Sequence, residues 1–443
     1  MLRCCAIALL CFTVAACSRN LSGRTSSAMA RRIAMAYDTS RVFSQSFTGF
    51  HLQDAETGEV ILSRNSDHYF TPASNVKILT LATCLAILGD SLPTLRYWEK
   101  QGGLYIMGAG DPTFLHERFE AWQPARHFLK NYPTEGLIIY TSEPTFFKKY
   151  GDGWAWDDAQ YDYQAERSGF PLYGNCFWVE LNPEKFQYEA QPAYFNRLYN
   201  TGLFGNGRAE NNNEWAISYN KPDEKRYIPF RTGPQLVADL LQDTLRRPVA
   251  IGAPVDITEK LQEPPDWKTL YACPVDTVYK WMMYESDNLF AEQLLIMAAE
   301  RKIGLLKPDS MIQVAIKEIF PKSEQPPRWV DGSGLSRYNL VTPRYLSQVL
   351  QQLYQKHDKT RLFSLFPAGG ARGTIQNWYG TPDKKPFVFA KTGSMSGVHC
   401  LSGYIVTDSG KTLIFSFMHN NFVGSNRPWK SEMQRLLQEI SHH

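Results

Sequence analysis

The chain has 443 residues, of which 43% are hydrophobic and 13% aromatic, and its formal net charge is +3. This composition is sufficient for a substantial core, and the length predicts two or three domains. The sequence has no long basic run and no basic stripe interleaved with aromatic residues, which argues against nucleic acid as a partner. No repeat period and no low-complexity tract stands out in it.

The N-terminus has the pattern of an export signal. Residues 4–16 form an apolar stretch behind Arg3 that is too short to span a bilayer. Residues 14–17 then resemble the lipobox of bacterial lipoproteins, in which Cys17 becomes the lipid-bearing first residue. The alternative is ordinary signal cleavage near Ala16 with an incidental cysteine. Under either alternative the mature protein is exported beyond the cytoplasmic membrane. Under the lipoprotein hypothesis, residues 1–16 are a signal peptide, residues 17–30 are a tether, and the periplasmic protein is attached to a membrane by its lipid.

The first half of the chain begins with recognisable local patterns. A short helix is predicted within residues 31–40, a hairpin over 47–62 with its turn at 56–58, and an apolar helix from Ser74 to about Leu88. From about residue 95 the composition changes: aromatic residues, glycines and prolines become frequent and the strand-like runs are short. A helix predicted over 234–245 interrupts these runs.

Helical character returns over 275–301, and the C-terminal part alternates strands with a last helix. A strand over 387–390 leads into Lys391, further strands are predicted over 398–407 and 412–418, and an amphipathic helix over 428–440 ends the chain. Antiparallel strands from both ends with helices between them predict one sheet covered by helices, an α+β (α/β sandwich) fold. We therefore predict one domain of residues 31–94 and 268–443 and a large β-rich insertion of residues 95–267; the residues considered below make the first of these the candidate catalytic domain.

Four cysteines follow the signal segment, namely Cys84, Cys176, Cys273 and Cys400. No Cys-x-x-Cys and no metal-type spacing occurs among them. In an exported protein they could form disulfides, whereas the apolar surroundings of Cys84 and Cys400 equally suit buried thiols. The sequence leaves this choice open.

A serine and a lysine three residues apart point to nucleophilic catalysis. Pro72 and Ala73 suit a loop that enters a helix, so Ser74 and Lys77 should share one helical face. A serine nucleophile needs a base within hydrogen-bond reach, and the chain has neither a Gly-x-Ser-x-Gly elbow nor a histidine context for a triad. Lys77 is therefore the candidate base. It has to be neutral, and both burial and a second nearby cation would lower its pKa.

Two further segments offer the remaining groups of such a site. In Ser286-Asp287-Asn288, Ser286 could relay a proton, and the Asn288 amide could bind Ser74 or Lys77 and the substrate backbone. Lys391 could be the second cation.

The strand that follows Lys391 suits substrate recognition. The hydroxyls of Thr392 and Ser394 could bind a terminal carboxylate, and Gly393 would let an extended peptide approach an edge strand. The backbone N–H groups of Ser74 and Ser394 are candidates for an oxyanion hole.

Each segment taken alone also has a structural interpretation. Ser74 and Lys77 could be a solvated pair on a helix, and residues 286–288 could cap the helix that follows them. Residues 391–393 could be a strand end with a turn glycine. Their joint occurrence in this order favours the catalytic interpretation only because a known enzyme family uses the same constellation.

Together these residues resemble the penicillin-binding proteins and, within them, the D-Ala-D-Ala carboxypeptidase/endopeptidase family of penicillin-binding protein 4 type. The resemblance runs from about residue 46 to 425, and the long separation of Ser74 from Ser286 is similar to that created by the inserted domains of this family. Serine β-lactamases have a shorter gap. The other matching segments are 72–77, 110–113, 153–158, 285–292, 331–337 and 391–398.

The resemblance implies acylation of Ser74 by the penultimate D-Ala of a peptidoglycan stem peptide, followed by hydrolysis, in carboxypeptidase or endopeptidase action. β-Lactams, which mimic D-Ala-D-Ala, would trap the acyl-enzyme. No metal or organic cofactor is implied, and the oligomeric state is left open. The alternatives are a serine β-lactamase and a non-catalytic cell-wall-binding protein of the same fold.

Overall fold

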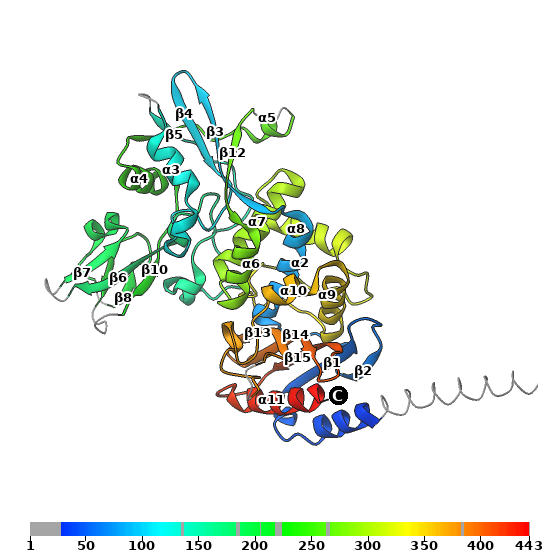
Figure 1. Cartoon of the computed structure of the whole chain (residues 1–443). Helices are drawn as coiled ribbons and strands as arrows, with labels where there is room; N and C mark the ends of the chain where they lie inside the picture. The colour runs from blue at the N-terminus through cyan, green and yellow to red at the C-terminus, as the bar shows by residue number, and fades with distance from the viewer. Residues whose placement is uncertain are drawn as a thin grey trace, which may run out of the picture. The chain divides into compact units, whose positions relative to one another are not determined.

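The computed structural model of the chain describes residues 28–133, 137–182, 187–203, 205–217, 224–262, 266–381 and 385–442 (Figure 1). The predicted signal peptide, Cys17 and most of the predicted tether lie outside the described residues. Among the residues that are described, no helix is both long and apolar enough to cross a membrane. The described residues form two compact units, one from the parts of the chain up to Pro72 and from Leu340 onward, and the other from the part between Ala73 and Asn339.

The first unit is built on a five-stranded antiparallel sheet in the order β13-β14-β15-β1-β2. Its strands are β1 (Phe47–Asp54), β2 (Val60–Arg64), β13 (Val388–Met395), β14 (Val398–Val406) and β15 (Thr412–Asn420). The first and last parts of the chain meet where β1 pairs with β15, with Phe50 opposite Phe417. The predicted hairpin and the predicted C-terminal strands are thereby confirmed.

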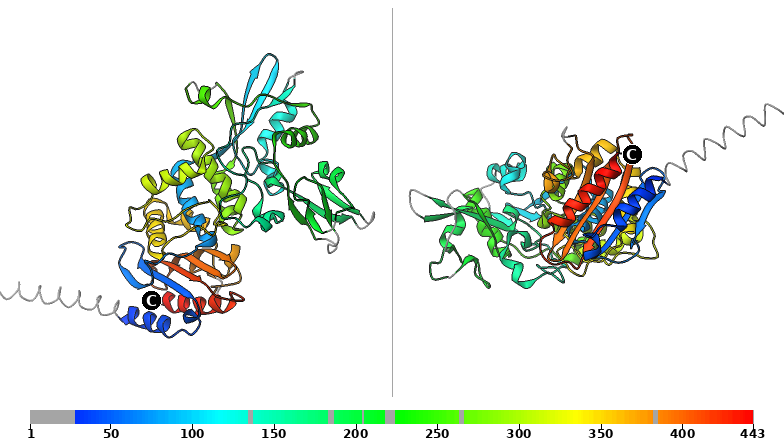
Figure 2. Two further views of the ribbon diagram at one scale, coloured as in Figure 1. Left: turned by 180° about the vertical axis from the view of Figure 1, so that it is seen from behind. Right: turned by 90° about the horizontal axis from the view of Figure 1, so that it is seen from below.

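Helices cover both faces of this sheet (Figures 1 and 2). On one side lie a helix over residues 28–38 and α11 (Arg427–Ser441), and on the other lies α9 (Pro343–Lys356), followed by α10 (Lys359–Leu365). The apolar stripe of α11 packs into a core with the sheet, in which the rings of Phe50 and Phe417 stack at 3.9 Å. Helix α9 begins at Pro343, and the hydroxyl of Thr342 caps it by accepting from the Tyr345 N–H at 3.1 Å.

The second unit contains a group of helices around α7 (Asn288–Ile303). Residues 289–299 of α7 are buried on all sides, which explains why the sequence there is apolar without a polar stripe. Its neighbours are α2 (Lys77–Ile87), α6 (Val275–Tyr284) and α8 (Pro308–Val314). The predicted helical segment over 275–301 is thus two helices, because the chain breaks between Tyr284 and Asn288.

The rest of the second unit is rich in strands, as predicted. A five-stranded sheet has the order β11-β5-β4-β3-β12, and β10-β6-β7 and β8-β9 form two smaller sheets. The strands are β3 (Ser91–Lys100), β4 (Gly103–Gly108), β5 (Ile138–Tyr140), β6 (Cys176–Asn182), β7 (Gln187–Gln191), β8 (Asn206–Arg208), β9 (Trp215–Ile217), β10 (Arg226–Pro229), β11 (Val249–Ile251) and β12 (Lys268–Pro274). The helices among them are α3 (Pro124–Asn131), α4 (Pro234–Leu245) and α5 (Ile257–Gln262).

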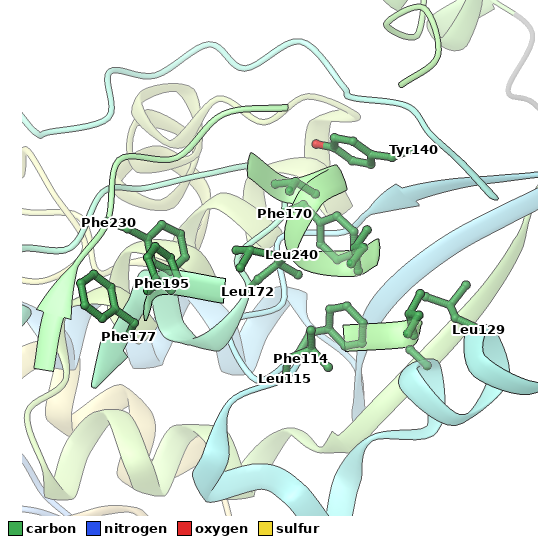
Figure 3. Close-up of a cluster of buried hydrophobic side chains, with 14 of the residues drawn as sticks. Phe114, Leu115, Leu129, Tyr140, Phe170, Leu172, Phe177, Phe195, Phe230 and Leu240 are labelled. Carbon is green, nitrogen blue, oxygen red and sulfur yellow. The ribbon is translucent and has the colours of Figure 1, made fainter. Parts of the chain in front are cut away.

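These strands and helices enclose a core of their own (Figure 3). Phe177 and Phe195 stack in it at 4.2 Å, and α4, which the sequence predicts over the same residues, contributes Leu240 and Leu241. The strands that lead into and out of the predicted insertion, β3 and β12, pair with each other. The domain limits at 95 and 267 stay a prediction.

The described cysteines Cys84, Cys176, Cys273 and Cys400 are free thiols. Cys84, Cys273 and Cys400 are buried, and burial raises the pKa of the Cys273 and Cys400 thiols to about 12. The sequence left disulfides and buried thiols open for these cysteines, and the structure shows free thiols, three of them buried.

Candidate active site

The segment around Ser74 forms a tight turn followed by a buried helix. Ser74 lies in a 3₁₀ turn (Ala73–Val76), and α2 continues directly from it at Lys77. Ala73 has a φ of 46°, a conformation that costs energy for any residue other than glycine. The Lys77 side chain is fully buried, so the interpretation of Ser74 and Lys77 as a solvated pair is wrong.

The Lys77 ammonium group has three hydrogen-bond partners, one for each of its hydrogens. Its Nζ donates to Ser74 Oγ at 3.0 Å, to Asn288 Oδ1 at 2.6 Å and to the Ser333 carbonyl at 2.6 Å. The amide oxygen and the carbonyl are acceptors only, whereas the serine hydroxyl can also donate. When the amine is neutral, its lone pair is therefore available to Ser74.

The electrostatic surroundings of Lys77 favour this neutral form. Burial lowers the pKa of Lys77 from 10.5 to about 8, and the carboxylates of Asp331, Asp287 and Glu292 offset part of that decrease. Near pH 8 a large share of the amine is therefore free to accept a proton, as a general base requires.

Asn288 is the first residue of α7, directly after the break that separates α7 from α6. Ser286 has a φ of 59°, and the Asp287 carboxylate caps α7 by accepting from the Phe290 N–H at 3.0 Å. The prediction of a helix cap at 286–288 is thus confirmed, and it accompanies the contact with Lys77. The Asn288 amide nitrogen donates to the Tyr163 carbonyl at 2.8 Å, which fixes the amide so that its oxygen faces Lys77.

A loop over residues 331–336 contributes a group that sequence reasoning missed. The family resemblance includes this loop, but nothing in it indicated that the Ser333 carbonyl would bind the lysine. The Asp331 carboxylate shapes the loop by accepting from the N–H groups of Gly334 at 2.9 Å and Ser336 at 2.7 Å. It also accepts from Trp154 Nε1 at 2.8 Å. The available signal was the Asp-Gly-Ser-Gly sequence, which is typical of a tight turn.

The Lys391 segment lies in the first unit on β13, at the edge of the sheet. Gly393 lies inside β13, where it pairs with Cys400 of β14, and the turn comes later, at Gly397. The interpretation of residues 391–393 as a strand end with a turn glycine is therefore wrong. The buried Lys391 donates its Nζ to the Thr392 carbonyl at 2.8 Å, and the Thr392 hydroxyl donates to Thr374 Oγ1 at 2.9 Å.

The contacts described for Lys391, Thr392 and Ser394 all lie within the first unit. The Ser394 hydroxyl is hydrogen-bonded to His399 Nδ1 at 2.9 Å, and this partner was not predicted from the sequence. The predicted roles of Ser286 and of residues 391–394 in one reaction with Ser74 stay predictions. Among the described residues, no group of three or more His, Cys, Asp or Glu side chains is arranged to hold a metal ion.

Comparison with known proteins agrees with this chemistry. The sequence profile of the D-Ala-D-Ala carboxypeptidase 3 (S13) family matches residues 31–440. The chain is 24% identical over 440 residues to D-alanyl-D-alanine carboxypeptidase DacB of Haemophilus influenzae, covering 90% of this chain and 91% of that protein. It is 26% identical over 431 residues to D-alanyl-D-alanine carboxypeptidase of an Actinomadura species, covering 85% and 78%.

The fold is similar to that of solved structures. The crystal structure of penicillin-binding protein 4 from Haemophilus influenzae has a TM-score of 0.70 at 20% identity and covers 94% of this chain and 99% of its own. The structure of that protein complexed with a β-lactam has a TM-score of 0.67 at 19% identity with the same coverage.

Proposed function

The chain belongs to the D-Ala-D-Ala carboxypeptidase 3 (S13) family and is a serine-type D-Ala-D-Ala peptidase, and we propose that Ser74 is its nucleophile and Lys77 its general base. The observation that carries this proposal is the fully buried Lys77 amine, 3.0 Å from Ser74 Oγ. A buried amine with a lowered pKa is what a serine needs for activation when no histidine serves as the base.

In the proposed reaction, the neutral Lys77 amine takes the proton of the Ser74 hydroxyl. The oxygen attacks the carbonyl of the penultimate D-Ala of a peptidoglycan stem peptide, and the peptide bond to the leaving group breaks. The proton passes to the leaving amine, which is D-Ala in carboxypeptidase action and the cross-linked strand in endopeptidase action. Water then hydrolyses the ester. Throughout, Asn288 and the Ser333 carbonyl hold Lys77 beside the serine.

We extend the proposal to the remaining predicted residues on the strength of their family order. Ser286 would relay the proton, and Lys391 would be the second cation. The hydroxyls of Thr392 and Ser394 and the approach over Gly393 would bind the terminal carboxylate, which the position of β13 at a sheet edge supports. The N–H groups of Ser74 and Ser394 would bind the oxyanion.

β-Lactams are the proposed inhibitors, and the wall side of the membrane is the proposed location. The β-lactam complex of the Haemophilus influenzae relative supports the first of these. The apolar stretch over 4–16 and the lipobox-like Val14-Ala15-Ala16-Cys17 support export to the periplasm and a lipid anchor on Cys17.

The test is the intact mass of the protein after incubation with benzylpenicillin, followed by peptide mapping and a D-Ala release assay. We expect one stable adduct on Ser74 and D-Ala release from a stem pentapeptide. Both should be lost in Ser74→Ala and retained in Ser91→Ala, an exposed serine on β3. Full D-Ala release by Ser74→Ala would overturn the assignment of the nucleophile. Penicillin consumption without a lasting adduct would favour a β-lactamase, and neither adduct nor consumption would favour a non-catalytic wall-binding protein.

A further inference from the structure

A buried ion pair links the β-rich part of the second unit to the helix that carries Asn288. Arg167 Nη1 lies 3.2 Å from Glu292 Oε2, and the two side chains are only 6% and 1% exposed. The other nitrogens of Arg167, Nε and Nη2, donate to the Lys148 carbonyl at 3.0 and 2.8 Å. Its guanidinium also lies 5.5 Å from the Trp154 ring centre, so it is fixed from several sides.

The second oxygen of the same carboxylate holds the loop that binds Lys77. Glu292 Oε1 accepts from the Ser333 N–H at 2.8 Å, and the Ser333 carbonyl accepts from Lys77 Nζ at 2.6 Å. Glu292 follows Asn288 by four residues in α7, which puts both side chains on one helical face. A continuous chain of contacts therefore runs from Arg167 through Glu292 and Ser333 to the amine.

Stability alone does not explain a charged pair at this position. Removing two charges from water costs about as much as their attraction returns, and apolar residues of similar volume often replace such pairs without loss. What an apolar replacement could not provide is an acceptor for the Ser333 N–H and a negative charge near the lysine.

We propose that Arg167 and Glu292 are positioning residues for Lys77: the pair fixes the Ser333 carbonyl against the amine and sets the negative charge that faces it. This inference rests on the proposed role of Lys77 as the base. Burial and the neighbouring Asp331 raise the pKa of the Glu292 carboxyl above its ordinary value, and the Arg167 guanidinium and the Ser333 hydrogen bond oppose that shift and favour the ionised form. The carboxylates that act on Lys77 are Asp331, Asp287 and Glu292.

The experiment measures the rate of acylation by a fluorescent penicillin between about pH 6 and 10 in the full-length protein. In wild type we expect the rate to rise with pH around a midpoint near the lowered pKa of Lys77, about 8. Arg167→Met combined with Glu292→Gln removes both buried charges, while the glutamine oxygen still accepts from Ser333. The double variant should acylate with its midpoint shifted to lower pH, because Lys77 has lost one negative neighbour.

The single variant Arg167→Met removes both the ion-pair partner of Glu292 and the cation that favours its ionised form, so Glu292 should hold the Ser333 loop less firmly and the acylation rate should fall on the order of tenfold or more. The matched control is the exposed pair Arg126–Glu120 of the same unit, changed to Met and Gln, for which we expect no shift. If Arg167→Met does not fold, the double variant and the control still decide.

A double-variant midpoint equal to that of wild type, or an equal shift in the control, would overturn the inference. Failure of the proposed function is distinguishable, since it would appear as the absence of a Ser74 adduct in wild type itself.

Discussion

Replacing Gly334 by alanine adds only one carbon atom, but it should disturb the backbone beside Ser74 directly. Its φ is +87°, and a Cβ added there would lie 2.1 Å from the Ala73 carbonyl oxygen and 3.0 Å from the Ser74 nitrogen. Because these are backbone atoms, no change of side-chain rotamer relieves the overlap. The left-handed conformation costs an alanine about 1–2 kcal/mol, and forcing extra volume into a packed site costs about 1–3 kcal/mol. Gly334→Ala should therefore lower the free energy of unfolding by about 2–5 kcal/mol.

Two other glycines of the same unit separate these contributions. Gly102 has a φ of +76° with nothing within 4 Å of an added Cβ, so Gly102→Ala should show the conformational cost alone. Gly89 has neither a positive φ nor a neighbour within 4 Å, so its alanine variant should be neutral or slightly stabilising. Guanidinium unfolding and the rate of acylation by a fluorescent penicillin would be measured for all three. Only Gly334→Ala should also lose acylation, and a Gly334→Ala protein that unfolds and acylates like Gly102→Ala would refute the reasoning.

Two further predictions concern the helix cap and the buried histidines. Asp287→Ala should destabilise the protein by about 1 kcal/mol because the Phe290 N–H loses its acceptor, whereas Asp287→Asn should retain the cap; equal denaturation midpoints for the two would contradict this. Burial lowers the pKa of His51 to about 4 and that of His399 to about 3, so between these values and 6.5 the unfolded chain binds protons that the folded chain does not. The contribution of these two histidines to the free energy of unfolding is therefore fully present above pH 6.5 and declines as the pH falls, by about 1–2 kcal/mol per histidine at pH 5. Equal free energies of unfolding at pH 7 and pH 5 would exclude this prediction.

Elements with a strong local pattern were predictable from the sequence. Helix α4 covers the predicted residues 234–245, and the hairpin of β1 and β2 has its turn at the predicted glycine. In both, the pattern of apolar residues and the turn chemistry indicate the same structure, so tertiary packing has nothing to override. The break between α6 and α7 was not predictable from periodicity. Residues 285–288, which span it, are all polar, and the helix cap predicted at 286–288 marks the new start.

The supporting contacts of the site could not be inferred, because they join residues far apart in the chain. Ser74 and Lys77 are three residues apart, and the sequence suffices to place them on one turn. Arg167 and Glu292, by contrast, are separated by 125 residues, and although Glu292 ends the matching segment 285–292, nothing in the sequence pairs it with Arg167. The role of the Ser333 carbonyl was equally unpredictable, because every residue has a backbone carbonyl and residue type does not show which one will bind a side chain.

Backbone strain at this site coincides with the groups that meet at Lys77. Ala73 and Ser286 both have φ above 40°, and each lies one or two residues before a side chain that contacts the amine. Such conformations cost about 1–3 kcal/mol each and persist only where the surrounding structure imposes them. At Ala73 that constraint is the close approach of Gly334, and at Ser286 it is the capped start of α7. Ser74 and Asn288 are therefore aimed at one buried lysine by packing that overrides local preference, as expected where a fold is selected for chemistry as well as for stability.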